Sequence, residues 1–345
     1  MKKIIALLAV LAMVFAMVAC APEAAPAAAP EAPATEATTE ATAEEAAPAV
    51  KLGVILVHDE NTGYDAAHID GIKAGAEAAG IPADSIVWKY NIAEDESCYD
   101  TAIDLVEQGC NYIFSDSYGH QFFMQQAASE NPDVVFVSMT GDQAALSGLT
   151  NFKNAFPHTF ESRYVSGVVA GMKLKELMDA GLVTDPYVGY VGAYPYAEVV
   201  SGYTAFFLGV QSIVPDAHMD VIYTNSWYDP TAEAEAANAL MSKGAHIISQ
   251  HADSTGAPSA VEAALAAGSV VYRVGYNIDM LAAAPTAALT SAQNNWGVYY
   301  TYAFMAALAG EEIATDWSEG YATGANMISP LGPSCAPGTA EKVAE

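Results

Sequence analysis

The sequence predicts an α/β protein made of two doubly wound, parallel-sheet lobes joined by a hinge. From Leu52 onward, short β-branched runs alternate with helical patterns, which is the signature of βαβ units and a parallel sheet. The alternation runs through two series of similar strand count. A length of 345 residues with 52% hydrophobic residues is enough for two cores. We therefore expect two α/β lobes in tandem along the chain.

The first series is predicted from β-rich runs that each precede an amphipathic segment. It closes with two further runs, the second of which leads into the next series. The expected strands are 52–57, 85–91, 112–115, 134–139 and 151–156, and the expected helices are 66–79, 97–108 and 121–130.

The second series repeats this alternation and ends in a shorter, mixed segment. Its expected strands are 187–192, 220–224, 246–249 and 270–275, and its expected helices are 161–178, 198–213, 231–241 and 258–267. A short strand at 289–291, a helix at 298–308 and a Gly/Pro-rich tail follow. We place hinges near 151–156, 276–279 and Gly310, so that lobe 1 is 50–157 plus 278–310 and lobe 2 is 158–277 plus 311–345.

The N-terminal residues are not expected to belong to the fold. Lys2 and Lys3 precede an apolar run at 4–18 that is too short for a comfortable membrane span, and Ala19 stands before Cys20. This resembles a bacterial lipoprotein signal, which implies a signal peptide at 1–19 and a lipid on Cys20. Residues 20–49, rich in Ala, Pro, Glu and Thr, are expected to form a disordered tether. The alternative is a plain secretory signal.

The charge balance excludes one class of partner. The formal net charge is -29, from 12 Lys and Arg against 41 Asp and Glu, whereas binding of phosphate backbones or anionic lipid headgroups needs a cationic face. We expect no nucleic-acid partner. Cys98, Cys110 and Cys335 show no metal spacing, and buried small hydrophobic side chains are the default interpretation.

A polar stretch after the predicted strand 246–249 is the first site candidate. Ligands of open parallel sheets bind beyond the carboxyl ends of the strands, where this chain has Gln250, His251 and Asp253. The alternative is that Asp253 or Ser254 caps the following helix.

Aromatic residues follow several predicted strands. Rings at strand ends are suited to stacking against a flat ligand, whereas any one of them taken alone could simply pack in the core. The residues are Tyr64, Tyr118, Tyr194, Tyr196, Trp227 and Tyr228. The pattern favours a planar heterocycle.

Carboxylates and amides share these loops and could hydrogen-bond a purine or a sugar. Helix capping and turn formation are the competing explanation for about half of them. They are Asp59, Asn61, Asp65, Asp116, Asp253, Asn277 and Asp279.

Enzymatic motifs are missing from the sequence. The histidines lie on separate predicted elements, and there is no Gly-x-Ser-x-Gly elbow, phosphate loop, His-Glu-x-x-His or zinc cysteine set. We expect no catalysis, no cofactor and no metal. A scattered acid pair leaves a surface hydrolase as the remaining enzymatic alternative.

Several motifs stand in order along the chain. They are Tyr64-Asp65, the segment 195–203 with Gly209, Ser226-Trp-Tyr-Asp-Pro230, Gln250-His-Ala-Asp-Ser254, Gly275-Tyr-Asn-Ile-Asp279 and Asn295-Trp-Gly-Val-Tyr-Tyr300. Together they resemble the basic membrane protein (BMP/PnrA-like) family, purine-binding lipoproteins of ABC importers with the type 1 periplasmic binding fold. The resemblance covers roughly residues 52–310.

The family pattern implies a role for individual residues. Tyr64 would stack on the base, Asp116 and Tyr118 would bind it from the same lobe, and Trp227 and Asp253 from the other. Two positions depart from the pattern: Asn277 stands where nucleoside-binding members usually have Asp, and Asn294 where they have Lys. Because both positions are associated with the ribose, a free base such as adenine becomes a candidate.

The sequence thus predicts a solute-binding lipoprotein on the extracytoplasmic face of the bacterial membrane, which passes a purine nucleoside or base to an ABC permease. A sugar-binding protein of the same fold and a sensory receptor domain are the alternatives. The expected ligand-binding residues are Asp59, Asn61, Tyr64, Asp65, Asp116, Tyr118, Tyr196, Trp227, Asp253, Asn277, Asp279 and Asn294.

Overall fold

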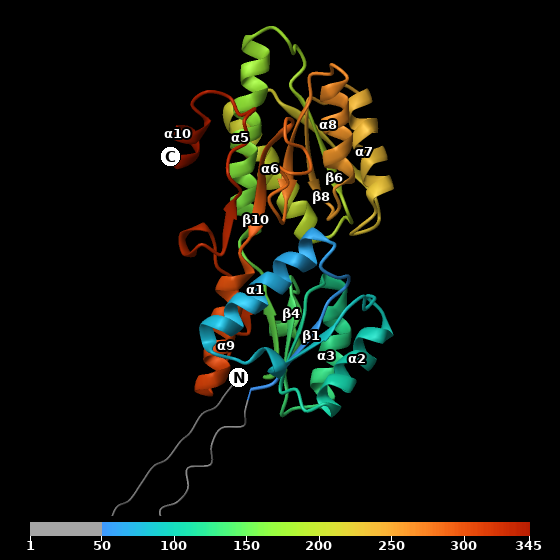
Figure 1. Cartoon of the computed structure of the whole chain (residues 1–345), viewed down its shortest axis with the longest axis vertical. Coiled ribbons are helices and arrows are strands. Elements are labelled where there is room, and N and C mark those ends of the chain that lie inside the picture. Colours follow the sequence, from blue (N-terminus) through green and yellow to red (C-terminus); the bar gives the residue numbers. More distant parts are fainter. Residues whose placement is uncertain (1–49) are drawn as a thin grey trace, which may run out of the picture. The chain divides into compact units, whose positions relative to one another are not determined.

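The computed structural model describes residues 50–345, and two six-stranded sheets organise them (Figure 1). The predicted signal peptide, Cys20 and the tether lie outside the described residues. Within residues 50–345, no helix combines the length and the apolar character that a membrane span requires. The predicted fold class, two parallel-dominated α/β lobes, is confirmed.

The first sheet is built entirely from parallel pairs. In sheet order its strands are β11 (Asp316–Trp317), β5 (Phe152–Ala155), β4 (Val135–Met139), β3 (Tyr112–Ser115), β1 (Leu52–Ile55) and β2 (Ile86–Lys89). We call this sheet with its helices the first lobe.

Helices cover both faces of the first sheet, because successive side chains of a strand point to opposite sides. Phe114 packs with α1 (Gly63–Ala79) and α9 (Trp296–Ala309). Its neighbour Ile113 packs with α2 (Glu96–Glu107) and α3 (Gln121–Glu130) on the other face. The short elements of this lobe are α4 (Ala144–Ser147) and the 3-10 helices η1 (Ala83–Ser85) and η2 (Tyr118–His120).

The second sheet is parallel except for the antiparallel pair of β10 and β12. In sheet order its strands are β12 (Asn326–Ile328), β10 (Ala288–Asn294), β9 (Tyr272–Tyr276), β8 (Ile247–His251), β6 (Tyr187–Gly192) and β7 (His218–Tyr223). We call this sheet with its helices the second lobe.

Two pairs of helices cover the second sheet. Tyr190 packs with α5 (Thr159–Asp179) and α6 (Ala197–Ile213), and Val191 packs with α7 (Pro230–Ser242) and α8 (Gly256–Ala266). The remaining elements are η3 (Tyr321–Thr323) and α10 (Thr339–Ala344), and α10 packs on α5.

Helices α5 and α6 approach each other closely through two glycines. A Cβ atom on Gly167 would lie 2.0 Å from the carbonyl oxygen of Phe206, and one on Gly209 would lie 2.2 Å from the carbonyl oxygen of Tyr164. Only glycine allows two backbones to pack at this separation. The contact matters for the site, since both helices carry residues that reach toward it.

The chain passes between the lobes at three places within residues 50–345: between β5 and α5, between β10 and α9, and between β11 and β12. Hydrogen bonds tie these passages together. Thr159 Oγ1 donates to Asn294 Oδ1 at 2.9 Å, Asn326 Nδ2 donates to the His158 carbonyl at 2.6 Å, and the Asn295 amide donates to the Ala325 carbonyl at 2.8 Å.

Two of the passages differ from the predicted hinges. The sequence placed 278–310 in lobe 1, but β10 pairs with β9 of the second sheet, so the chain crosses at 294–296 instead of near 276–279. It crosses back after β11, at 318–325, instead of near Gly310, because β11 extends the first sheet beside β5. β11 is short and β10 is largely polar, so their sequences carry a weak strand signal. Their pairing with β5 and β9 decides to which lobe each belongs.

Candidate functional site

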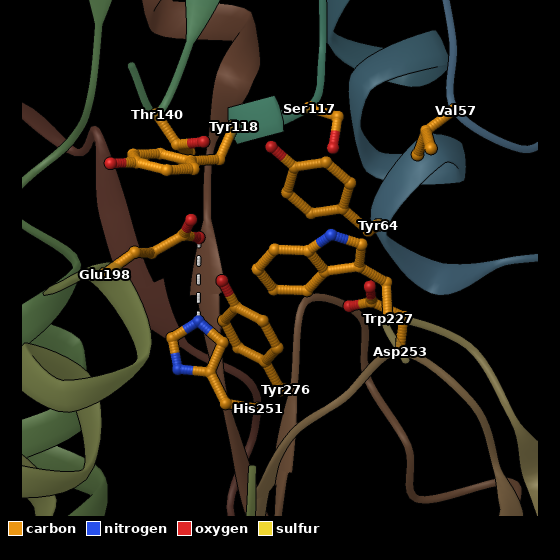
Figure 2. Close-up of a pocket in the computed structure, with 10 residues that line it drawn as sticks. All are labelled: Val57, Tyr64, Ser117, Tyr118, Thr140, Glu198, Trp227, His251, Asp253 and Tyr276. Carbon is orange, nitrogen blue, oxygen red and sulfur yellow. Dashed lines mark ion pairs between the residues drawn. The ribbon is translucent and has the colours of Figure 1, made fainter. Parts of the chain in front are cut away.

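A cavity lies between the carboxyl ends of the strands of the two sheets, where an open parallel sheet binds its ligand (Figure 2). Residues of both lobes line it, and they pack so closely that only about 10 Å³, roughly the space of one water molecule, remains free between them. Its lining consists of Val57, Tyr64, Ser117, Tyr118 and Thr140 from the first lobe and Glu198, Trp227, His251, Asp253 and Tyr276 from the second.

Tyr64 forms one wall of the cavity and is held rigidly. Its hydroxyl donates a hydrogen bond to the Asp116 carbonyl at 2.5 Å, and its ring meets His68 edge-on with 4.6 Å between centroids. His68 in turn stacks on Trp296 at 4.1 Å. The ring of Tyr64 therefore stands in a fixed position at the N-terminus of α1.

Aromatic rings from both lobes stack beside the cavity. Tyr118 of the first lobe stacks on Tyr196 of the second at 5.2 Å between centroids, and Tyr196 stacks on Tyr194 at 5.0 Å. Trp227 meets Tyr194 edge-on at 5.2 Å. Tyr196 thus supports the rings that line the cavity, although it is not itself part of the lining.

A hydrogen bond from Trp227 joins the two lobes. Its indole nitrogen lies 3.2 and 3.3 Å from the two carboxylate oxygens of Glu94, in the loop after β2. Glu94 also accepts from Ser117 Oγ at 2.5 Å and from the Gly119 amide at 2.9 Å. One carboxylate of the first lobe therefore orients both a cavity loop and the indole of the second lobe.

Asp253 is buried in the cavity wall and held by neighbours. Its carboxylate accepts from Asn277 Nδ2 at 2.7 Å, and its amide donates to the Trp227 carbonyl at 2.8 Å. Burial raises the pKa of Asp253 well above its usual range, and the charge of Glu233 adds to the rise. Asn277 thus donates a hydrogen bond to this carboxylate without adding a charge beside it.

Replacing Asn277 with Asp is expected to lower the free energy of unfolding by about 2 kcal/mol at pH 8, because the buried carboxylate of Asp253 then faces a second one. The pair shares a proton when folded, so its pKa lies above the unfolded value and the penalty grows as pH rises. At pH 4, close to the pKa of about 3.9 of an unfolded aspartate, most of the loss should disappear. Denaturant unfolding at both pH values measures the difference.

Asn91→Asp is the matched control for this substitution. Asn91 also has a positive φ, of 57° against 63° for Asn277, and its amide also donates to an aspartate, Asp59, at 3.3 Å. That pair is exposed, so Asn91→Asp should change the free energy of unfolding by less than about 0.5 kcal/mol. Equal losses in both variants would contradict the role of burial.

Glu198, His251 and Tyr276 form the polar floor of the cavity. Burial raises the pKa of Glu198 to about 7, opposed by Thr140 and by the charge of Arg163. Burial lowers the pKa of His251 well below its usual range, so the imidazole is neutral, and its Nε2 lies 3.6 Å from Glu198 Oε1. Within residues 50–345 neither His251 Nε2 nor the Tyr276 hydroxyl has a hydrogen-bond partner. Unsatisfied buried polar atoms in a cavity are available to a ligand.

Arg163 lies beneath this floor. Its guanidinium carbon is 3.7 Å from the centroid of the Tyr276 ring, and its Nη1 donates to the Gln250 carbonyl at 2.8 Å. The side chain is fully buried. The cation supports the aromatic floor from below and partly offsets the carboxyl groups of the cavity.

Five of the residues that the sequence singled out line the cavity: Tyr64, Tyr118, Trp227, His251 and Asp253. Two others hold loops instead. Asp65 accepts from the His58 amide at 2.7 Å and from the Thr62 hydroxyl, and Asp116 accepts from the Val57 amide at 3.0 Å. Burial raises the pKa of Asp116, and the charge of Asp65 adds to the rise. This carboxyl pair shapes the rim of the cavity without lining it.

The other predicted residues lie outside the cavity. Asp59 accepts from the amide and the side chain of Asn61 at 3.0 and 2.7 Å in an exposed turn, and Asp279 accepts from the Leu281 amide at 2.9 Å. These three residues form turns, as the competing explanation expected. Asn294 and Asn277 border a separate hollow beside α1.

Sequence reasoning missed Glu198, Tyr276, Thr140, Ser117 and Val57. Glu198 and Tyr276 stand inside motifs that the sequence singled out, at 195–203 and 275–279. Glu198 looked like a first-turn helix acid, and only its burial, 6% exposed, reveals it as a cavity residue. The signal available in the sequence was the position of Glu198 directly after the loop that carries Tyr194 and Tyr196.

Comparison with known proteins gives a consistent result. Residues 54–325 match the model of the family described as ABC transporter substrate-binding protein PnrA-like. The chain is 34% identical over 256 residues to a purine-binding protein of Brucella abortus (strain 2308), covering 74% of this chain and 68% of that protein. It is 32% identical over 232 residues to an ABC transporter glucose-binding protein, so described, of Haloferax volcanii, covering 67% and 55%. A solved ABC solute-binding protein from Conexibacter woesei has a TM-score of 0.66 at 20% identity, covering 86% of this chain and 94% of that one.

Proposed function

This chain belongs to the family of PnrA-like ABC transporter substrate-binding proteins, and on that premise we propose that it captures a purine base or nucleoside between its lobes. The ligand is passed unchanged to a membrane permease. Capture takes place outside the cytoplasm, where substrate-binding proteins of importers act. A lipid on Cys20 holds the protein at the membrane in this proposal, as the motif before that cysteine suggests.

One observation carries the purine proposal: aromatic rings from both lobes surround a single cavity. Tyr64 belongs to the first lobe, and Trp227 and Tyr276 belong to the second. Offset stacking of aromatic rings contributes about 1 kcal/mol beyond area burial. A planar heterocycle that enters between these faces gains this contribution on more than one side.

Polar groups of the same cavity complement a nitrogen heterocycle. Asp253 and Glu198 supply carboxyl oxygens, and His251 Nε2 and the Tyr276 hydroxyl have no partner within the described chain. The edges of a purine offer both donors and acceptors to such groups. A ligand that leaves them unpaired would bind weakly, because each buried unsatisfied group costs about 1 to 3 kcal/mol.

Ligand contacts to both lobes explain how binding favours closure. A ligand shifts a conformational equilibrium only by its differential affinity for the two states. A base between Tyr64 and Trp227 makes both contacts only when the lobes are together. Closure then presents both lobes to the permease in a defined arrangement, which is how ligand occupancy is signalled.

Thermal unfolding with candidate ligands tests the proposal. A purine at about 100 times its Kd should stabilise the folded state by about 2.7 kcal/mol, and so raise the Tm by about 5 °C or more. Mass spectrometry of molecules released from the denatured protein should recover an intact purine. Glucose and ribose serve as controls, since the Haloferax relative is described as glucose-binding. A Tm rise with a monosaccharide and none with any purine would favour a sugar instead, and recovery of base and sugar from an added nucleoside would reveal hydrolysis.

A further inference from the structure

We infer that Glu198 reads the hydrogen-bonding edge of the bound base and that its protonation selects between 6-aminopurines such as adenine and 6-oxopurines such as guanine. This inference rests on the proposed purine-binding function and deepens it. It concerns a residue that the sequence did not single out as a ligand contact.

The geometry directs Glu198 at the ligand. It is the second residue of α6 and is 6% exposed, and Figure 2 shows its carboxyl group turned toward the other residues that line the cavity. The nearest ring nitrogen, His251 Nε2, lies 3.6 Å from Oε1, beyond normal hydrogen-bonding distance. No hydrogen bond to His251 therefore holds the carboxyl oxygens away from a ligand.

Groups from several elements face Glu198, and their charges limit how it titrates. Burial disfavours the ionised form, and the charge of Glu94 in the loop after β2 adds to this effect. Thr140 and the charge of Arg163 in α5 favour the ionised form, but burial outweighs them and raises the pKa of Glu198 to about 7. The other titratable groups around it are His251 at the end of β8, Asp253 after β8, Tyr276 at the end of β9, Tyr118 in η2 and Tyr64 in α1.

The two forms of a carboxyl group match different purine edges. A neutral carboxyl has one donor and one acceptor, whereas an ionised one only accepts. Adenine presents its N6 amino donor beside a ring-nitrogen acceptor, which pairs with the neutral form. Guanine presents the N1 and N2 donors side by side, which pair with the ionised form. Hence protonated Glu198 selects adenine and ionised Glu198 selects guanine.

The pH dependence of affinity tests this assignment. Adenine requires protonated Glu198, and the protonated fraction falls about 30-fold between pH 5.5 and pH 8.5. The Kd for adenine should therefore rise about 30-fold over this range. Guanine at low micromolar concentration should show the opposite slope. Isothermal calorimetry in buffers of different ionisation enthalpy should also detect uptake of about 0.8 proton per adenine at pH 7.5. Proton uptake needs no variant and so remains informative if a substitution disturbs folding.

Glu198→Gln removes the titration and keeps one donor and one acceptor. The Kd of this variant for adenine should stay constant between pH 5.5 and pH 8.5. Its affinity for guanine should be lower than that of the wild type over the same pH range. Glu233→Gln is the matched control. Burial raises the pKa of Glu233 to about 7 as well, but its carboxylate accepts from the Ser254 and Asp229 amides at 3.2 and 3.3 Å outside the cavity. The Glu233 variant should retain the slope of the wild type.

The outcomes separate the two proposals. An adenine Kd that is tight but constant from pH 5.5 to 8.5, without proton uptake, would overturn the role of Glu198 while leaving purine capture intact. A slope that survives Glu198→Gln and disappears in Glu233→Gln would overturn it too. A wild-type protein that binds no purine at any pH would refute the proposed function itself.

Discussion

Replacing Gly167 with alanine is expected to lower the free energy of unfolding by about 3 kcal/mol, the upper range for overpacking. The added Cβ would lie 2.0 Å from the Phe206 carbonyl oxygen. Because the obstacle is backbone, no rotamer change can relieve it, and α5 and α6 must separate. Affinity should fall as well, since α5 carries Arg163 and α6 carries Glu198. Denaturant unfolding and calorimetry measure the two effects.

Gly297→Ala is the control for this prediction. Gly297 also lies in a helix, near the start of α9, but the nearest atom to an added Cβ is Asn295 Oδ1 at 3.3 Å, the end of a side chain that can move. Gly297→Ala should change the free energy of unfolding by less than about 1 kcal/mol, because alanine also reduces the conformational entropy of the unfolded chain. A Gly167 variant as stable as the wild type would contradict the close packing of α5 on α6.

Trp227→Ala is expected to weaken purine binding about 100-fold. The substitution removes a stacking face, apolar contact area and the hydrogen bond from the indole to Glu94, which together are worth about 3 kcal/mol. Trp227 is half-buried and lies in a loop after β7, so the fold should survive. Calorimetric titration measures the Kd, and thermal unfolding without ligand verifies the fold.

Trp227→Phe separates the two contributions of this side chain. Phenylalanine keeps an aromatic face but cannot donate to Glu94, so affinity should fall only about 5-fold, the worth of one partly buried hydrogen bond. Glu94→Gln should lower the affinity less than Trp227→Phe does, because the amide oxygen of glutamine still accepts a hydrogen bond from the indole. If Trp227→Ala bound adenine as tightly as the wild type, the base would not be stacked on this ring.

The sequence predicts the lobes well because local patterns encode them. Each buried strand such as β1 or β6 is a short apolar run followed by a helical period, and both signals are local. The passages between lobes are different, since β10 and β11 belong to their sheets through pairing with β9 and β5. Such pairing connects distant residues, and a single sequence does not display it. The hinges were therefore misplaced after residue 275.

For the site, residue type and position predict the rings better than the acids. Tyr64, Tyr118 and Trp227 follow strands and line the cavity. Carboxylates in the same loops also accept hydrogen bonds from backbone amides, as Asp59 and Asp116 do. Residue type alone does not distinguish such a structural carboxylate from one that contacts a ligand. Glu198 was overlooked for the converse reason, since a first-turn helix acid is ordinarily solvent-exposed and dipole-stabilising.

The tied passages between the lobes have a mechanical consequence for Trp227. They lie at the β11 and β12 edges of the sheets, whereas Glu94 and Trp227 follow β2 and β7, the strands at the opposite edges. If the lobes rotate about these passages, the contact between the indole and the Glu94 carboxylate lies at the edge of the site that would part, so it is a contact that opening would break.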